Sequence, residues 1–507
     1  MASMAGLGEL STGALASCGR VEAYSDAIFS IVATIMILPI AHSEIEEDAD
    51  LRESLVNMIP KLFVYFVSFL LICSLWASHC WLFETIEKTD EVILMLNLGL
   101  MMVVTFLPYT FTLLGDFAQD PLAIILFCCA VVLVQLLQVF FIFYAFRTPN
   151  ILHVEVRISE DKTRRRNVMY FTAVVPMVLC LLAMILASFS PLAADLCLLV
   201  LAFSTLIKKG ILMIYRRQRA HFMRENSEEN PVPMSAIRPS FRVLLEDSIP
   251  KERIIAFSDG VFAIVATLII LDISEGSLPS PDDVVKFGSL ALALAQHDQI
   301  FLAYGATFVT VGMLWFVHHS LLEHITDMNK LMGFFNTLCL GCIGLSPLGF
   351  KLTSLFELHE HYYNEMVAMH LSCAIIFLAG ILQCAIWVTG LCTPQRHVTT
   401  DGNFGGKSHA YLTAKLMLYP VMSLFVYFLS FASFGLTLQA LNGMQIGAPL
   451  VFLVVYLGFR KIPRQTSRAN HGDLHGPNLP SLSWLSESHG LHERTTPSPS
   501  SGQEIFQ

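Results

Sequence analysis

The chain alternates between long apolar runs and short polar segments. Four long runs hold no charged residue at all: Leu62–Phe83, Leu122–Phe146, Val168–Phe189 and Leu416–Leu441. A helix of about 20 apolar residues spans the hydrocarbon core of a bilayer. Only 14% of the residues are charged and 54% are hydrophobic, whereas soluble domains carry about 25% charged residues. The pattern therefore predicts an all-α polytopic membrane protein.

The apolar pattern is duplicated along the chain. Residues Arg20–Ile40 match residues Arg253–Ile273 without a gap, and twelve of the 21 positions are identical. A second block follows in the same order, in which Leu75, Trp76, His79, Asn97 and Pro108 correspond to Leu314, Trp315, His318, Asn336 and Pro347. Self-similarity of this length indicates a tandem duplication.

Each repeat contains six candidate spans, which predicts twelve transmembrane helices in two tandem six-helix repeats. Because six is even, both repeats have the same orientation and are parallel. The spans are expected near 20–41, 58–83, 91–114, 119–146, 167–189 and 192–215, then near 253–273, 297–324, 328–352, 362–392, 409–436 and 439–460. The expected segments are an N-terminus at 1–19, repeats at 20–220 and 253–460, a linker at 221–252 and a tail at 461–507.

Basic residues gather on one side of the predicted bundle. They cluster at 157–166, 208–242 and 460–468, while the loops expected on the other side are acidic or nearly uncharged. Since cytoplasmic loops carry the excess of Lys and Arg, we expect the N-terminus, the linker and the C-terminus to be cytoplasmic. The tail is rich in Ser, Pro, Gly and His, a composition typical of disorder.

Polar side chains recur near one end of the first three helices of each repeat. Charged groups at membrane depth are costly and usually paired, so these residues predict two copies of one hydrogen-bond network that anchors the first helix. The network consists of Arg20, Asp26, Trp76, His79, Asn97, Arg253, Asp259, Trp315, His318 and Asn336. The same residues also suit polar contacts that only hold helices together.

The first helix of each repeat carries a face of small and hydroxyl-bearing residues. Positions spaced i, i+4 and i+7 share one side of a helix. In the two repeats this face holds Ala27, Ile31, Thr34 and Leu38, and Gly260, Ile264, Thr267 and Leu271. Such a face suits a narrow pathway whose apolar constriction gates by dewetting, and it also suits small-residue packing. Two such helices do not enclose a pore, whereas a homodimer supplies four around one axis.

Several functional signatures are absent from the sequence. It has no TVGYG-like segment for a re-entrant filter loop, no Arg-rich voltage-sensing helix, no Walker A motif and no nucleophile–base arrangement. The group His318, His319, Glu323 and His324 is not copied as a set in the first repeat, so a solvated helix end suits it better than a metal site. We expect no enzyme activity, no metal, no cofactor and no nucleic-acid partner.

The motif Arg-x-x-x-[Tyr/Phe]-Ser-Asp opens both repeats. Around this motif, the chain resembles the transmembrane protein 175 family of endosomal/lysosomal potassium channels. The resemblance extends from about Arg20 to Leu457. The segments that carry it are Tyr24–Thr34, Met36–Pro39, Thr105–Phe111, Phe257–Thr267, Leu314–Trp315 and His318–Leu321.

The resemblance implies a homodimer with one central pore in endosomal and lysosomal membranes. It also implies that potassium permeates in preference to sodium, with a leak of protons. The first helix of each repeat would line the pore, with Ile31 and Ile264 as the constriction and Ser30, Thr34 and Thr267 as the polar layer beside it. Because Ala263 stands where the copy of Ser30 is expected, the layer would not be fully symmetric. The network residues would be structural anchors of the pore helices.

Two other classes of protein remain open from the residues alone. Parallel six-helix repeats also occur in secondary transporters, which should have a polar or charged site at the midplane of the membrane. The mid-span positions here are mostly apolar and the duplicated charges lie at one end. A non-conducting scaffold or membrane-embedded enzyme is the third possibility, and no residue pattern favours it.

Overall fold

The structure of the protein, a computed structural model, describes most of the two repeats. The described residues are 16–41, 50–117, 120–158, 162–190, 192–194, 196–201, 249–276, 278–356, 362–392, 398, 406–432 and 437–461. In this part of the chain, eleven helices are long and apolar enough to cross a membrane.

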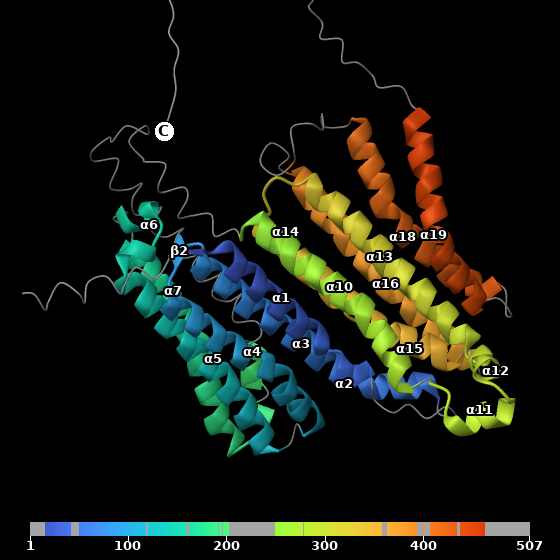
Figure 1. The fold of residues 1–507 in the computed structure, drawn as a ribbon, viewed down its shortest axis with the longest axis horizontal. Coiled ribbons are helices and arrows are strands. Elements are labelled where there is room, and N and C mark those ends of the chain that lie inside the picture. Colours follow the sequence, from blue (N-terminus) through green and yellow to red (C-terminus); the bar gives the residue numbers. More distant parts are fainter. Residues whose placement is uncertain are drawn as a thin grey trace, which may run out of the picture. The chain divides into compact units, whose positions relative to one another are not determined.

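The described part of the first repeat contains five long helices and several short elements (Figure 1). Its long helices are α1 (Gly19–Ile35), α3 (Leu51–Phe83), α4 (Glu91–Asp116), α5 (Pro121–Arg147) and α7 (Lys162–Ala187). Its short elements are α2 (Leu38–Ala41), α6 (Val154–Ile158), the 3-10 helix η1 (Pro149–Ile151) and the strands β1 (Ala16–Ser17) and β2 (Lys88–Thr89), which pair antiparallel. Helix α1 packs on α3 and α4, and α5 packs on α4 and α7.

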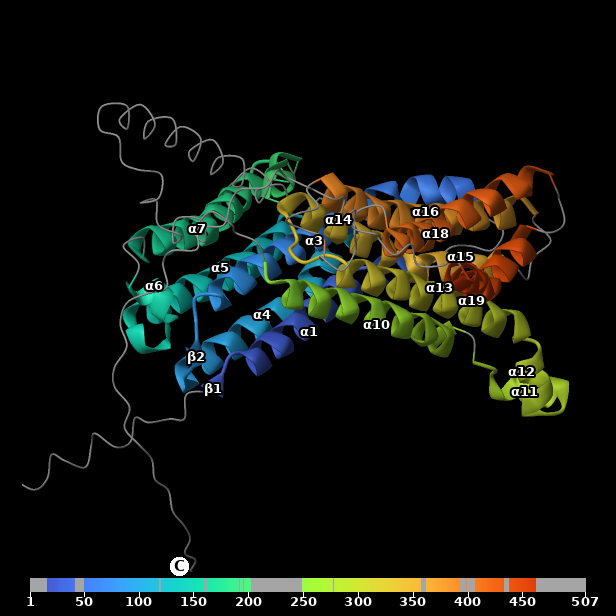
Figure 2. The ribbon, with the colours of Figure 1, turned by 90° about the horizontal axis from the view of Figure 1, so that it is seen from above.

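The second repeat follows the same plan with one helix broken in two. Its long helices are α10 (Lys251–Gly276), α13 (Asp298–Glu323), α16 (Tyr362–Cys392), α18 (Lys407–Ala432) and α19 (Thr437–Lys461). The two shorter helices α14 (Lys330–Ile343) and α15 (Ser346–Phe356) together make one membrane span. Helix α10 packs on α13, α14 and α15, and α16 packs on α14 and α18. The short helices α11 (Pro281–Phe287) and α12 (Leu290–Ala295) lie at one end of the long helices (Figure 2).

The predicted fold class of an all-α, polytopic membrane protein with tandem repeats is confirmed. The sixth predicted span, 192–215, lies largely outside the described residues, which include only a short apolar helix over Leu192–Leu201 there. Nearly all of the predicted N-terminus, linker and tail also lies outside the described residues. Two short helices, α11 and α12, lie between the spans predicted near 253–273 and 297–324.

Side-chain caps mark where several of the long helices begin. Asp50, Asp90 and Asp120 precede α3, α4 and α5, and each carboxylate accepts a hydrogen bond from a backbone N–H in the first turn. Asn329 caps α14 in the same way. A side-chain oxygen at this position satisfies an N–H group that has no partner within the helix. The caps therefore separate consecutive apolar runs into distinct helices.

The break between α14 and α15 departs from the single span expected near 328–352. At the break, the Leu345 N–H donates to Cys342 O three residues back rather than to Gly341 O. The Tyr65 hydroxyl, from α3 of the first repeat, donates to Gly341 O at 3.1 Å. Because a buried carbonyl needs a donor, Tyr65 stabilises the helix break and joins the two repeats there.

The two repeats meet mainly through their first helices. Helix α1 packs along α10, while α3 contacts α14 and α16, and α2 contacts α15. One close approach is between α1 and α10 at Gly260, where an added Cβ atom would lie 2.6 Å from Ser30 Oγ. The helix pair predicted to line a pore is thus also the main contact between the repeats.

Packing inside the second repeat generates a stability prediction. A Cβ atom on Gly380 of α16 would lie 2.7 Å from Cδ of Pro420 in α18, and a proline ring cannot turn away. We expect Gly380→Ala to destabilise the protein by about 1–3 kcal/mol through overpacking. Thermal unfolding in detergent would measure this. The control is Gly333→Ala, whose Cβ would meet nothing within 4 Å. An unchanged melting temperature for Gly380→Ala would contradict the α16–α18 packing.

Candidate functional site

The most buried charged group among the described residues is Asp26 on α1. Its Oδ2 atom accepts a hydrogen bond from Arg253 Nε at 2.6 Å, and its Oδ1 atom accepts from Arg253 Nη2 at 2.7 Å. Trp76 Nε1 also donates to Oδ1 at 2.7 Å. Asp26 is only 1% exposed and Arg253 only 7%. A buried carboxylate with a bidentate guanidinium and a third donor has its charge and its lone pairs well satisfied.

The pair crosses the boundary between the repeats. Asp26 and Trp76 come from the first repeat, whereas Arg253 opens α10 of the second. Next to the pair, the Phe257 ring stacks on Trp76 with the ring centroids 4.3 Å apart. Ser30 Oγ donates to the Phe257 carbonyl at 3.0 Å. These contacts require α1 and α10 to lie close together, which the absence of a side chain at Gly260 allows.

A second polar cluster ties α1 to its own repeat. Asn97 Nδ2 on α4 donates to Ser25 Oγ at 3.1 Å, and Asn97 Oδ1 lies 2.9 Å from His79 Nε2 on α3. Because an amide oxygen only accepts, this contact requires the His79 proton to be on Nε2. All three side chains are buried. The cluster thus holds α1, α3 and α4 together.

The corresponding cluster in the second repeat is incomplete. Trp315 Nε1 donates to Asp259 Oδ1 at 2.8 Å, and Asn336 Nδ2 donates to Ser258 Oγ at 3.2 Å. Among the described residues, however, neither ring nitrogen of His318 has a hydrogen-bond partner, and Asn336 Oδ1 has none either. The predicted two copies of one network therefore differ in their connections.

The two arginines of the motif have different surroundings. Arg253 is buried against Asp26, and its Nη1 atom lies 3.7 Å from Glu22 Oε1. Arg20, at the matching position of α1, is exposed and forms no hydrogen bond or ion pair with the described residues. Asp259, the copy of Asp26, accepts from Trp315 but from no arginine in the described chain. Asp26 and Arg253 thus form an ion pair, whereas their copies, Asp259 and Arg20, do not pair with each other within the described chain.

The predicted pore face is only partly exposed in the single chain. On α1, Ala27 and Ile31 are exposed and Thr34 is buried. Leu38, which was expected on the same helix, begins the separate helix α2 and is half-buried. On α10, Thr267 and Leu271 are exposed, whereas Gly260 and Ile264 are half-buried.

The hydroxyl groups of the predicted polar layer all bond to the backbone. Ser30 is buried in the contact between α1 and α10, and Thr34 Oγ1 donates to the backbone of its own helix. Thr267 Oγ1 donates to Ile264 O at 2.8 Å on an exposed part of α10. The outward-facing stripe on this pair of helices therefore combines Ala27, Ile31, Ala263 and Thr267.

Sequence reasoning found most of these residues but not all of their partners. Glu22, Ser25 and Phe257 take part in the site although they were not assigned to the anchoring network. The duplicated Ser-Asp motif already placed Ser25 and Ser258 beside the two aspartates. The sequence could not show that Arg253 pairs with the aspartate of the other repeat. Each motif contains both an arginine and an aspartate, so a pair within one motif was equally possible.

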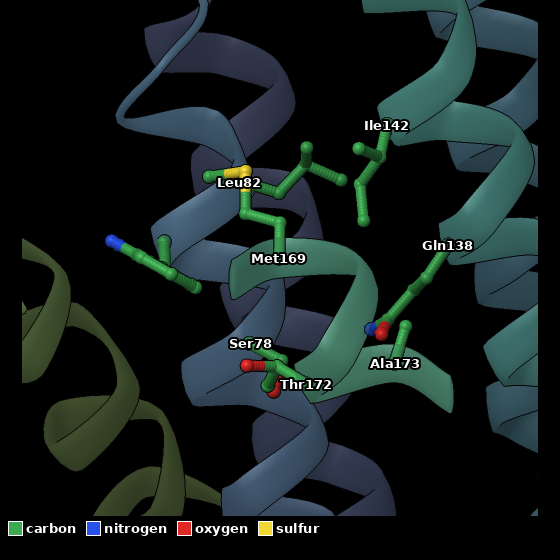
Figure 3. A pocket seen from close by; sticks show the side chains of 8 residues that line it. Ser78, Leu82, Gln138, Ile142, Met169, Thr172 and Ala173 are labelled. Carbon is green, nitrogen blue, oxygen red and sulfur yellow. The ribbon is translucent and has the colours of Figure 1, made fainter. Parts of the chain in front are cut away.

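A small cavity lies away from this site, between α3, α5 and α7 (Figure 3). Its walls include Ser78, Gln138 and Thr172, and Gln138 Nε2 has no hydrogen-bond partner among the described residues. None of the lining side chains is acidic or basic. The described part of the chain also holds no cluster of three His, Cys, Asp or Glu residues suited to a metal. The interface of α1 and α10 thus remains the better candidate site.

Comparison with known proteins identifies similar sequences. The family model of the endosomal/lysosomal potassium channel TMEM175 matches residues 20–108 and 253–347. The chain is 39% identical over 445 residues to the "endosomal/lysosomal proton channel TMEM175" of Danio rerio, covering 87% of this chain and 84% of that protein. Its counterpart in Gallus gallus is 40% identical, with 87% of each chain covered. A protein of Chamaesiphon minutus named a potassium channel is 34% identical over 107 residues, which is 21% of this chain and 53% of that protein.

The unequal arginines generate a direct prediction. Arg253→Gln leaves the buried Asp26 carboxylate without its cation, and breaking a buried ion pair in this way costs about 3–5 kcal/mol. We expect a large fall in thermal stability in detergent. Arg20→Gln is the matched control, because Arg20 is exposed and unpaired within the described chain; it should change the stability of the isolated chain little. Equal losses from the two substitutions would show that the Asp26–Arg253 pair is not special.

Proposed function

Because this chain belongs to the TMEM175 family of endosomal/lysosomal channels, we propose that it conducts potassium and protons across endosomal and lysosomal membranes. The protein is a multi-pass membrane protein of a channel family, which is not an enzyme class. Relatives named as proton channels and as a potassium channel support the two permeant ions. Potassium is the permeant ion rather than a bound cofactor.

The pore runs along α1 and α10. Ile31 and Ile264 form its apolar constriction, and Ser30, Thr34 and Thr267 form the polar layer beside it. Ile31 supports this assignment because it is 41% exposed directly beside Ser30, which bonds across the α1–α10 contact. Thr267 supports it as well, since it is exposed three residues after Ile264. An apolar ring of this kind excludes ions when it dewets and passes them when it widens.

The pore is completed by a second copy of the chain. Within one chain, Arg253 of α10 meets Asp26 of α1. The copy of this contact, with the roles of the two helices exchanged, would join α1 of one subunit to α10 of another. It would bring Arg20 of one subunit to Asp259 of the partner subunit. Both side chains are available for this, since Arg20 is exposed and has no ionic partner among the described residues, and Asp259 is only partly buried. This unmatched pair of opposite charges is the observation that carries the proposal.

The stacking of Phe257 on Trp76 has a copy in Tyr24 and Trp315, which do not stack on each other among the described residues. Trp315 lies instead against His319 of its own helix. Phe257 is 2% exposed and stacks on Trp76, which is 6% exposed. Their copies, Tyr24 and Trp315, are 50% and 38% exposed. An exposed tryptophan with an exposed tyrosine at the complementary position fits a stacking contact between subunits. A homodimer would thus arrange four first helices around one axis.

In this arrangement the termini face the cytoplasm. The basic clusters at 157–166, 208–242 and 460–468 support this, because the span count predicts them on one side of the membrane and cytoplasmic loops carry the excess of Lys and Arg. The repeats at 20–220 and 253–460 form the membrane domain, with lipid around it. The linker at 221–252 and the tail at 461–507 lie on the cytoplasmic side.

A secondary transporter is the alternative function. It would need a polar or charged site near the middle of the membrane. Arg253 lies in the first turn of α10, and Asp26 lies seven residues after the start of the Gly19–Ala41 span. The pair is therefore nearer the start of these spans than their middle, which favours a channel. Recordings from enlarged endolysosomes under a potassium gradient separate the two functions. Ohmic currents that reverse near the potassium potential support the channel, whereas saturating currents that need a coupled ion favour the transporter.

The constriction generates a prediction for those recordings. Ile31→Asn and Ile264→Asn each place an amide in the apolar ring, which lowers the cost of wetting it. We expect a several-fold higher conductance or weaker selectivity for potassium. The control is Leu133→Asn on α5, an exposed apolar position on a helix that does not pack on α1 or α10. Currents unchanged by both isoleucine variants would remove these residues from the pore.

The subunit contact generates a prediction for native mass measurements in mild detergent. Asp259→Arg places two cations together at the proposed contact and should lower the dimer fraction at least several-fold. Combining it with Arg20→Glu restores opposite charges and should recover the dimer. Charge reversal at the exposed Asp282 is the control. Monomers alone for the unmodified protein, or no recovery in the double variant, would contradict the arrangement.

A further inference from the structure

Three aromatic residues of α3 fill the contact between the repeats. Tyr65, Phe69 and Trp76 are at most 6% exposed, and α3 packs on α14 and α16 of the second repeat. Their copies on α13 are Tyr304, Phe308 and Trp315. Phe308 and Trp315 are 47% and 38% exposed, and Tyr304 is half-buried. The same aromatic stripe is thus covered in one repeat and uncovered in the other.

The surface that receives α3 is shaped by two glycines. An added Cβ on Gly341 would lie 3.3 Å from the rings of Phe66 and Phe69, and one on Gly344 would collide with the Tyr65 hydroxyl. That hydroxyl donates to Gly341 O at the break between α14 and α15. Tyr65 therefore enters a notch that exists only because both positions lack side chains.

The corresponding surface on the first repeat is α4. Met102 and Thr105 stand where Gly341 and Gly344 stand in the second repeat, and both are exposed, as are Phe106 and Tyr109. Thr105 Oγ1 donates to Met102 O at 2.8 Å, so the carbonyl that corresponds to Gly341 O already has a hydroxyl donor. Helix α4 is also unbroken here. This surface can receive an aromatic stripe but has no notch for a tyrosine.

Exposure alone says little in a membrane protein, because lipid covers apolar surfaces at no cost. Two further observations point to a second copy of the chain. The exposed stripe on α13 continues to Trp315, which holds Asp259, and Asp259 is the proposed partner of Arg20 from another subunit. The two exposed surfaces are also the repeat-related copies of two surfaces that already bind each other within the chain.

We propose that the exposed face of α4, formed by Met102, Thr105, Phe106 and Tyr109, is the docking surface for α13 of a second copy. Tyr304 of the partner subunit lies across Met102 and Thr105 instead of entering the helix. The contact between subunits is therefore shallower than the contact between repeats, which Gly260, Gly341 and Gly344 bring close together. This inference rests on the proposed dimer and adds a contact between subunits, from α4 of one to α13 of the other, beside the proposed contact of the first helices.

Cross-linking between two differently tagged chains tests the docking surface. Both chains carry Cys129→Ser and Cys392→Ser, which remove the exposed cysteines among the described residues. One chain also carries Thr105→Cys and the other Tyr304→Cys, and a short bifunctional thiol reagent is added to membranes that contain both. The control replaces Thr105→Cys by Met95→Cys, an exposed position on the same helix about 15 Å away, at 1.5 Å per residue.

We expect a cross-linked heterodimer from the 105–304 combination at several times the yield of the 95–304 combination. Native mass measurement of the same chains, without reagent, reports whether they are dimers. Dimers that give no selective 105–304 product would overturn the docking surface and leave the proposed dimer intact. Monomers alone would overturn both. Equal yields at positions 95 and 105 would also overturn the surface, since they indicate random collision.

A matched pair of substitutions tests whether Tyr304 enters the facing helix less deeply than Tyr65 does. Tyr65→Phe removes the hydroxyl donor of a buried carbonyl, so we expect a clear fall in the melting temperature of the protein in detergent. Tyr304→Phe removes a hydroxyl that, in this proposal, has no acceptor in the helix. It should leave both the melting temperature and the dimer fraction from native mass measurement unchanged. A dimer fraction that falls severalfold in Tyr304→Phe would show that Tyr304 inserts as Tyr65 does, and would overturn the shallower contact.

Discussion

The ion pair between Asp26 and Arg253 is the constraint on which the rest of the arrangement depends. A buried carboxylate in a membrane protein needs a cation and donors close at hand, and here the cation comes from the other repeat. The pair fixes how α1 and α10 lie against each other. Trp76 and Phe257 stack beside it, and Ser30 bonds across the same contact. One electrostatic requirement thus joins the two halves of the chain where the proposed pore begins.

Duplication gave both repeats the same motif but not the same surroundings. In the first repeat, Asn97 links Ser25 to His79, whereas in the second, among the described residues, the Asn336 side chain bonds only to Ser258. The glycines are also unequally distributed, because Gly260, Gly341 and Gly344 have Ala27, Met102 and Thr105 as their copies. Close contacts therefore form where two repeats of one chain meet. The copies of those contacts stay open on the surface, where a second subunit can use them.

The sequence was enough to predict the helices, the duplication and the residues of the motif, since apolar length and repeated blocks are local properties. It was not enough to predict the partners. Arg253 has two chemically equal aspartates to choose from, and only the packing of α1 on α10 decides between them. The helix break at Gly344 was also missed, because Pro347 beyond it has its copy, Pro108, inside the unbroken α4. The Tyr65 hydroxyl that bonds at the break comes from a helix far away in the sequence. The orientation of the termini and the constriction at Ile31 and Ile264 stay predictions.

The central claim is that one Arg–Asp contact is made within each chain and its copy is made between two chains. A structure of the protein in lipid nanodiscs, determined by electron cryo-microscopy, tests this claim most directly. The account predicts that the Arg20 guanidinium lies about 2.7–2.9 Å from the carboxylate of Asp259 of the partner subunit, the usual distance of a charge-assisted hydrogen bond. An Arg20 that faces lipid or bonds within its own chain, with Asp259 bonded to no arginine, would contradict it.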